Sequence, residues 1–382
     1  MLTGFIYWLS EGFYSLIEFP KVEDMLLLAL VFLIPLELFK HRLNYNLILK
    51  NRLLLFLFYC FLVSAIQANI NFSQPLIFGI RASRIFFIYA VVFIYLSMSL
   101  THISYKSIYR FVVFTSIFLI FINFFTYFSN NQSYLQNHVI DRFDDFRFLI
   151  GGTSIIYFYL FLLANTDRGK FPIIGLIGLM IVMVIIAKTR SLIFPLLLIT
   201  TFTLLRINSV RRFTQVLMIL FLVLIAFVFS NKVGNNILDL LQLLFDEFNS
   251  HDGNVAIRVV GLDYYWERLD FFSMIFGFGI DNKIYSDMYN PQYSLSDLGA
   301  FRVLYYHGII GIVLFALTLY DLYRESSKGD LPLHKFGRYF VYFQFLSPTL
   351  TFVYHPTAMY IYIFTLLYIK FHNKKTICQI GY

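Results

Sequence analysis

Long apolar stretches separated by short polar segments run through most of the chain. A helix that crosses a hydrocarbon core about 30 Å thick needs about 20 mostly apolar residues. Runs of this kind predict about 11 spans, within a range of about 10–12. Their approximate bounds are 25–39, 53–68, 85–100, 109–128, 148–164, 172–187, 191–207, 213–230, 300–320, 339–353 and 357–370. The pattern predicts an all-α polytopic membrane protein.

Two further segments complete this picture of the chain. Residues 2–19 are apolar and aromatic but contain Glu11 and Glu18, so they form either a twelfth span or a helix in the membrane interface, which we favour. The segment 231–299 is a long loop, and a loop of this length in a compact protein is usually functional or disordered. No linker-like composition divides the chain, so we expect residues 1–382 to form a single membrane domain.

Composition agrees with the hydrophobic pattern. Hydrophobic residues make up 59% of the 382 residues and charged residues 14%, with a mean hydropathy of +0.71, which excludes an ordinary soluble domain. The net charge of +8 is explained by basic cytoplasmic loops, so we expect no nucleic-acid partner. The two cysteines, Cys60 and Cys378, lie too far apart in sequence to suggest a disulfide framework or a metal site.

Basic residues predict the orientation of the spans. Eighteen of the 30 Lys and Arg residues fall in one alternating set of short segments. They are Lys40, Arg42, Lys50, Arg52, Lys106, Arg110, Arg168, Lys170, Arg206, Arg211, Arg212, Arg324, Lys328, Lys335, Arg338, Lys370, Lys374 and Lys375. The positive-inside rule makes this side cytoplasmic, together with the C-terminus, and places the 231–299 loop outside.

A second group of basic residues falls on or near the predicted outer side, where the positive-inside rule disfavours them. Its members are Arg81, Arg84, Arg142, Arg147, Lys188, Arg190, Arg258, Arg268 and Arg302. Snorkelling to lipid phosphates, or pairing with Asp141, Asp144, Asp145 and Glu267, would explain individual members. As a group, arginines on one face suit a phosphate or diphosphate, because the planar guanidinium can donate two parallel hydrogen bonds.

Other candidate residues have both a structural and a functional interpretation. Tyr264, Tyr265 and Trp266 could stack on sugar rings or anchor the chain in the interface. His307 falls inside a predicted span, where a hydrogen-bonded core histidine is the simpler interpretation. No metal-binding, Walker A or serine-hydrolase signature occurs, so we expect neither a metal nor a cofactor.

Four short motifs resemble one known family. They are Arg147-Phe-Leu-Ile-Gly151, Lys188-Thr-Arg-Ser191, Arg258 followed by Gly277-Phe-Gly279, and Ser296-Asp297-Leu-Gly299 leading into Tyr306-His-Gly308-Ile-Ile-Gly311. Together with the span count and the late outer loop, they resemble the O-antigen polymerase and ligase superfamily, over residues of about 81–320. The fold is then expected to be similar to that of membrane-embedded C-type glycosyltransferases.

The resemblance implies an activity. Members of this family act in the bacterial cytoplasmic membrane, where they transfer a glycan from undecaprenyl diphosphate to a sugar hydroxyl of another carrier-linked repeat. By this resemblance Arg147, Arg190 and Arg258 would stabilise the diphosphate leaving group, and Asp297 would be the base, ahead of His307 and Glu267. The expected substrate-binding residues are Arg81, Arg84, Lys188, Arg268, Arg302, His307, Tyr264 and Trp266. The expected partners are the undecaprenyl-diphosphate-linked oligosaccharide and the bilayer, with a chain-length regulator and a flippase as potential partners.

Two alternatives stay open at this point. The ligases of the superfamily have a His-Asn pair where this chain has Ser296-Asp297, which favours a polymerase of O-antigen, capsule or exopolysaccharide over a ligase. A flippase or another transporter would need charged residues distributed through the spans and helices broken near the membrane midplane. The centres of most predicted spans lack charge, which disfavours transport.

Overall fold

The computed structural model describes residues 51–99, 139–142, 145–148, 254–281, 295–346, 351–354 and 356–380. These residues form mainly helices. The elements are α4 (Arg52–Phe72), α5 (Leu76–Ser99), β1 (Val139–Arg142), β2 (Asp145–Phe148), α13 (Asn254–Trp266), α14 (Phe271–Phe276), the 3₁₀ helix η3 (Leu295–Leu298), α15 (Ala300–Ser326), α16 (Pro332–Leu346), η4 (Phe352–Tyr354) and α17 (Pro356–Ile380). Three helical stretches in this part of the chain are long and apolar enough to cross a membrane, namely α4, Leu76–Ser97 of α5, and α15.

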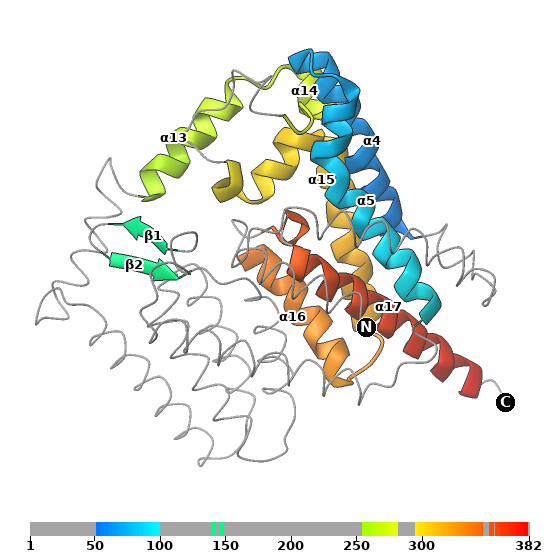
Figure 1. Ribbon diagram of the computed structural model, residues 1–382. Coiled ribbons are helices and arrows are strands. Elements are labelled where there is room, and N and C mark those ends of the chain that lie inside the picture. Colours follow the sequence, from blue (N-terminus) through cyan, green and yellow to red (C-terminus); the bar gives the residue numbers. More distant parts are fainter. Residues whose placement is uncertain are drawn as a thin grey trace, which may run out of the picture.

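The longest helices pack together as one group. Helices α4 and α5 form an antiparallel pair, and α15 packs against α4 (Figure 1). Helix α14 meets the first turns of α15 at the top of this group, while α16 and α17 pack against its lower part. Following the predicted orientation, we call the end of the molecule at α14 the outer end, and the opposite end of α4 and α15 the inner end.

Local sequence explains where α4 and α5 begin and how closely they approach. The side chain of Asn51 accepts a hydrogen bond from Leu53 N at 3.1 Å, which caps the first turn of α4. Pro75 precedes α5, and its carbonyl accepts from the first turn. Gly79 of α5 lies against Ala65 of α4, where a Cβ would come within 2.9 Å of the Ala65 Cα. Small residues at this crossing let the two backbones approach closely.

The core between these helices is rich in aromatic residues. Phe352 and Tyr362 stack with ring centroids 4.7 Å apart, and Phe315 lies 5.4 Å from Phe352. The Tyr362 hydroxyl donates to the carbonyl of Thr318 at 2.6 Å, so its polar group is satisfied. Aromatic pairs with offset or edge-on geometry stabilise a core beyond the area that they bury.

Five predicted spans fall on described residues, and each corresponds to a helix with shifted bounds. Helix α5 begins at Leu76 rather than at 85, because Arg81 and Arg84 are accommodated within it rather than in the preceding loop. Helix α16 begins at Pro332 rather than at 339. Helices α4, α15 and α17 all extend beyond their predicted C-terminal ends. The remaining spans, apart from residue 148, and residues 2–19 lie outside the described residues, so the count of about 11 stays a prediction.

One short β-hairpin departs from the all-α expectation. Strands β1 and β2 are antiparallel, and Val139 pairs with Phe148 while Ile140 pairs with Arg147. The sequence predicted that Arg147 opens a helical span at 148, whereas both residues belong to β2. β-Branched residues at 139 and 140 and aromatic residues at 146 and 148 favour strands, and only two residues separate the two strands.

Candidate functional site

Helix α15 is broken at Gly308, near the outer end. The backbone there has φ 66° and ψ −171°, a conformation open essentially to glycine alone. The carbonyls of Tyr305 and Tyr306 accept hydrogen bonds from the backbone N–H groups of Phe278 at 2.8 Å and Gly279 at 3.0 Å. A segment about 30 residues earlier in the chain is thus bonded directly to the break.

The segment that bonds to the break is a buried loop, residues 277–281, which follows α14. Side chains of α4, and of Gln74 just after it, bond further backbone groups of this loop. Ser64 Oγ accepts from Ile280 N at 2.8 Å, and Asn71 Nδ2 donates to the Phe278 carbonyl at 3.2 Å. Gln74, just after α4, donates to the Ile280 carbonyl at 3.5 Å. Irregular backbone at membrane depth requires such partners, because no water is there to replace them.

Glycine is required at two positions of the buried loop. Gly277 and Gly279 have φ of 83° and 80°. A Cβ on Gly277 would overlap the backbone of Tyr306 and His307, and a Cβ on Gly279 would overlap α4. A substitution at either position would therefore combine backbone strain with a clash against main-chain atoms.

Asp270 caps the N-terminal end of helix α14. The Asp270 carboxylate accepts from the Ser273 hydroxyl and from Ser273 N, the latter at 2.7 Å. These hydrogen bonds hold the pKa of Asp270 below its usual range. The C-terminal end of the same helix is bonded in turn, because Gly277 N donates to the Ser273 carbonyl at 2.7 Å. Ser273 therefore links the capped start of α14 to the start of the buried loop.

Arg302 brings a positive charge to this region, and its guanidinium lies against aromatic rings. Its Cζ is 4.0 Å from the centroid of the Tyr354 ring and 5.6 Å from that of Tyr306. The Tyr354 hydroxyl donates to the Arg302 carbonyl at 3.4 Å. The Arg302 Nε is buried and has no hydrogen-bond partner among the described residues. Cation–π contacts with these rings hold the charge in place, and no carboxylate of the described residues pairs with it.

His307 lies next to the break and is buried, with 1% of its surface exposed. Its ring is parallel to that of Tyr354, with centroids 6.3 Å apart, and edge-on to Phe86 at 5.3 Å. Neither ring nitrogen has a hydrogen-bond partner within the described part of the chain. Burial agrees with the expected core histidine, but the expected hydrogen bond is not found there. The Oε1 of Gln67, on α4, is likewise buried without a partner in this part.

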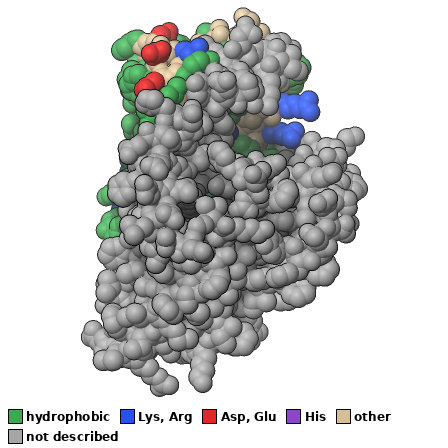
Figure 2. Space-filling model, turned by 90° about the vertical axis from the view of Figure 1, so that its left-hand side faces the viewer, with side chains coloured by type: hydrophobic (Ala, Val, Ile, Leu, Met, Phe, Trp, Pro, Cys, Tyr) green, Lys and Arg blue, Asp and Glu red, His purple; other side chains and the backbone are tan. Residues whose placement is uncertain are grey.

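Arg268, Tyr264 and Trp266 lie at the surface of the same end. The Arg268 Cζ lies 3.5 Å from the Tyr264 ring centroid, and Arg268 Nη1 donates to the Tyr264 carbonyl at 2.7 Å. Trp266 is 49% exposed and packs at 6.0 Å from Phe301. Acidic, basic and hydrophobic side chains share this end of the surface (Figure 2). The exposure of Trp266 suits either stacking on a sugar or anchoring in the interface.

The other predicted site residues lie on several different elements. Arg81 is exposed and Arg84 half-buried, both on α5. Arg258 belongs to α13 and Asp297 to η3, which directly precedes α15. Lys188 and Arg190 lie outside the described residues. The structure therefore brings Arg302 and His307 together with the Gly277-Phe-Gly279 motif, and leaves the grouping of Arg147, Arg190 and Arg258 as a prediction.

Sequence reasoning missed the polar face of α4. Ser64, Gln67 and Asn71 recur at intervals of three or four residues, which places them on one face of α4, and Gln74 follows just after the helix. Three of the four bond the buried loop. Polar residues at helical spacing in an otherwise apolar span were a usable signal for this contact.

No protein-family model matches this sequence, and no curated protein matches it either. The resemblance to glycan polymerases and ligases therefore rests on the short motifs, the predicted span count and the late outer loop.

Proposed function

We propose that the chain polymerises undecaprenyl-diphosphate-linked oligosaccharide repeats into a surface polysaccharide, at the outer face of a bacterial cytoplasmic membrane. In this reaction the bond between the anomeric carbon of the donor glycan and the diphosphate oxygen breaks. The acceptor hydroxyl oxygen bonds to that carbon and loses its proton to a base, for which Asp297 is the candidate. The bonding electrons leave with undecaprenyl diphosphate.

The contact between two motifs carries the proposal. Gly277-Phe-Gly279 and Tyr306-His-Gly308 were singled out by resemblance, and they are about 30 residues apart in sequence. Their backbones are hydrogen-bonded to each other at the break in α15. Motifs that serve one site are expected to meet in space, and this contact supports their common role.

The polar groups at this contact suit a ligand with many oxygens. Arg302 supplies a positive charge, and its Nε joins both His307 nitrogens and Gln67 Oε1 as buried atoms without a partner in the described residues. Buried polar atoms of this kind call for a ligand, a water or an ion. A diphosphate leaving group gains most from a fixed cation placed where its charge develops. Arg302 is in this proposal a diphosphate-binding residue.

The test uses the full chain in nanodiscs with carrier-linked repeats from the source bacterium, followed by gel analysis of the glycan. The wild-type protein should convert single repeats into a ladder. Arg302→Gln should slow ladder formation about 100-fold, the usual cost of removing one donor to a developing charge. Arg147→Ala, Arg190→Ala, Arg258→Ala and Asp297→Ala should do so as well. Lys335→Gln, at the inner end, is the matched control and should leave the rate unchanged.

Three results would redirect the proposal. Repeats that cross the bilayer without covalent change would indicate a flippase. Transfer to a lipid core but not to another repeat would indicate a ligase. A deletion strain that keeps its full ladder would show that another protein is the polymerase.

A further inference from the structure

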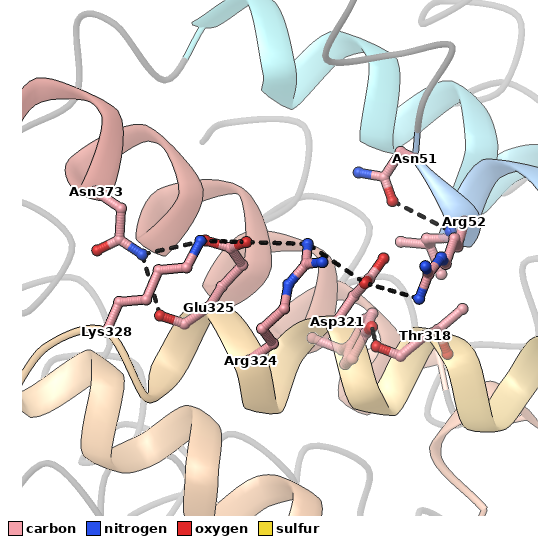
Figure 3. Close-up of polar contacts among 10 residues, drawn as sticks. Asn51, Arg52, Thr318, Asp321, Arg324, Glu325, Lys328 and Asn373 are labelled. Carbon is pink, nitrogen blue, oxygen red and sulfur yellow. Dashed lines mark hydrogen bonds and ion pairs between the residues drawn. The ribbon is translucent and has the colours of Figure 1, made fainter. Parts of the chain in front are cut away.

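At the inner end, five side chains of alternating sign form a continuous chain, which we call the ionic cluster (Figure 3). Arg52 of α4 pairs with Asp321 of α15 at 3.3 Å, and Arg324 lies 3.7 Å from the same carboxylate. Arg324 also pairs with Glu325 at 3.2 Å, and Lys328 pairs with Glu325 at 2.7 Å. The cluster thus joins α4 to the last turns of α15.

The two signs differ in exposure. The side chains of Asp321 and Glu325 are only 6% and 8% exposed, whereas those of Arg52, Arg324 and Lys328 are 40–47% exposed. The carboxylates are buried and hold the cationic side chains in place, and nearly half of each cationic side chain is exposed. Asn373 of α17 fixes Glu325 from the other side, by donating to its carbonyl at 3.0 Å and its carboxylate at 3.3 Å.

Among the described residues, positive charge is in excess at this cluster. Three cations share two carboxylates, and Lys370 of α17 also interacts electrostatically with Asp321 and Glu325. The buried acids therefore neutralise only part of the charge. The outward-facing halves of Arg52, Arg324 and Lys328 are available to an anion that approaches from the surface.

The cluster lies at the end of apolar helix surfaces. Leu55, one turn from Arg52 on the same face of α4, is 59% exposed. Tyr320, one turn before Arg324 on the same face of α15, is 53% exposed, and Val313 lies two turns further along at 50%. On helices long and apolar enough to cross a membrane, exposed apolar residues of this kind are expected to face lipid chains. The cations therefore stand where apolar, lipid-facing surface gives way to the polar headgroup region.

From this arrangement we infer that the ionic cluster binds the headgroup of an anionic phospholipid. The lipid phosphodiester accepts hydrogen bonds from Arg52, Arg324 and Lys328, and an acyl chain lies along the exposed residues of α4 or α15. A free anion would make no contact with the apolar surface. A zwitterionic lipid carries a positive group of its own, which would be repelled by Arg52, Arg324 and Lys328. Basic sites between helix ends are a known mode of lipid recognition. The inference does not depend on the proposed enzymatic activity.

Native mass spectrometry of the full chain tests the site, with phosphatidylglycerol and phosphatidylcholine offered at equal concentration. The wild-type protein should retain phosphatidylglycerol preferentially. Each cation near an anionic lipid surface contributes about fivefold, so Arg324→Gln with Lys328→Gln should reduce the preference about 25-fold. The charge-conserving pair Arg324→Lys with Lys328→Arg should keep most of it. Lys335→Gln removes a nearby charge outside the cluster and serves as the control.

The inference is overturned if the double Gln variant keeps its preference, or if Lys335→Gln loses as much, since charge anywhere on this surface would then suffice. Displacement of the lipid by millimolar inorganic phosphate would assign the cluster to a free anion instead. If the double variant does not fold, Lys328→Gln alone still leaves Arg324 on Glu325, and it should reduce the preference about fivefold.

Discussion

The two ends of α15 are held by different kinds of bond. At the outer end, the break at Gly308 is bonded by backbone groups of the buried loop, and uncharged side chains of α4 bond that loop and the His307 carbonyl. At the inner end, the last turns are held by ion pairs among Arg52, Asp321, Arg324, Glu325 and Lys328. The outer contact depends on backbone shape and the inner one on charge.

The difference follows from what surrounds each end. At the outer end, the buried loop needs every polar group bonded within the protein, and backbone groups bond each other without adding charge. At the inner end the cations are 40–47% exposed, so water solvates them in part, and they in turn stabilise the buried carboxylates. We therefore expect substitutions to cost more at the outer end than at the inner one.

The largest effect is expected for Gly308→Ala. A Cβ there would strike the Ile275 carbonyl, and φ of 66° with ψ of −171° is closed to alanine. We expect a loss of at least about 3 kcal/mol in the free energy of unfolding, measured by thermal unfolding in detergent. Val313→Ala, on the exposed face of the same helix, should cost about 0.5 kcal/mol or less. Equal costs for the two variants would contradict the shape-dependent contact at the outer end.

The next effect is expected at the inner end, for Asp321→Asn. It leaves Arg52 and Arg324 without the carboxylate that they share, and Asp321 is buried while both arginines reach water. We expect a loss of about 1–2 kcal/mol, which should shrink as salt is raised. Asp330→Asn is the matched control, because Asp330 is 90% exposed in its pair with Arg338 and should give no measurable change. A salt-independent loss would show that Asp321 acts through packing.

A smaller effect is expected for Tyr59→Phe. The hydroxyl of Tyr59 donates to the His307 carbonyl at 3.0 Å, next to the break. Removing it leaves a buried acceptor with one bond fewer, which should cost about 1 kcal/mol. Tyr320→Phe removes an exposed hydroxyl from α15 and should be neutral. The same thermal unfolding assay compares them, and a neutral Tyr59→Phe would mean that the carbonyl finds another donor.

The smallest effect is a dependence on pH confined to α14. Because hydrogen bonds from Ser273 lower the folded pKa of Asp270 below 3.8, the cap stabilises α14 fully only above that value. The stabilisation should be lost as pH falls through the folded pKa. Hydrogen exchange of the α14 amides, corrected for the pH dependence of the intrinsic exchange rate, should show this loss of protection between pH 5 and pH 2 in the wild type. Asp270→Asn should flatten the profile, and an unchanged profile would assign the effect to another carboxylate.

Some of the fold was predictable because hydropathy encodes it directly. The predicted spans at 53–68, 85–100, 300–320, 339–353 and 357–370 each correspond to a described helix. Their bounds were less predictable, because a helix can continue past an arginine whose charged end reaches the surface, as α5 does at Arg81. The hairpin was missed since four-residue strands leave only a weak pattern.

The candidate site was predictable only in part. Gly277, Gly279 and Gly308 were identified within motifs, but nothing in the linear pattern pairs them or assigns Ser64 and Asn71 to the same contact. Snorkelling or an acidic partner was offered for Arg302 and its group, and in the described part of the chain its guanidinium lies against the Tyr354 ring. The choice between a carboxylate, a ring and a ligand depends on which segments meet, which local sequence does not state.

The sequence alone determined that this is a membrane protein, approximately where the described apolar helices lie, and which residues carry charge. These properties follow from burial in lipid, which acts on each segment separately. Only the tertiary structure decided that the buried loop bonds the break in α15, and that Arg52 shares Asp321 with Arg324. Both contacts join segments more than 20 residues apart, so they exist only once the chain has packed.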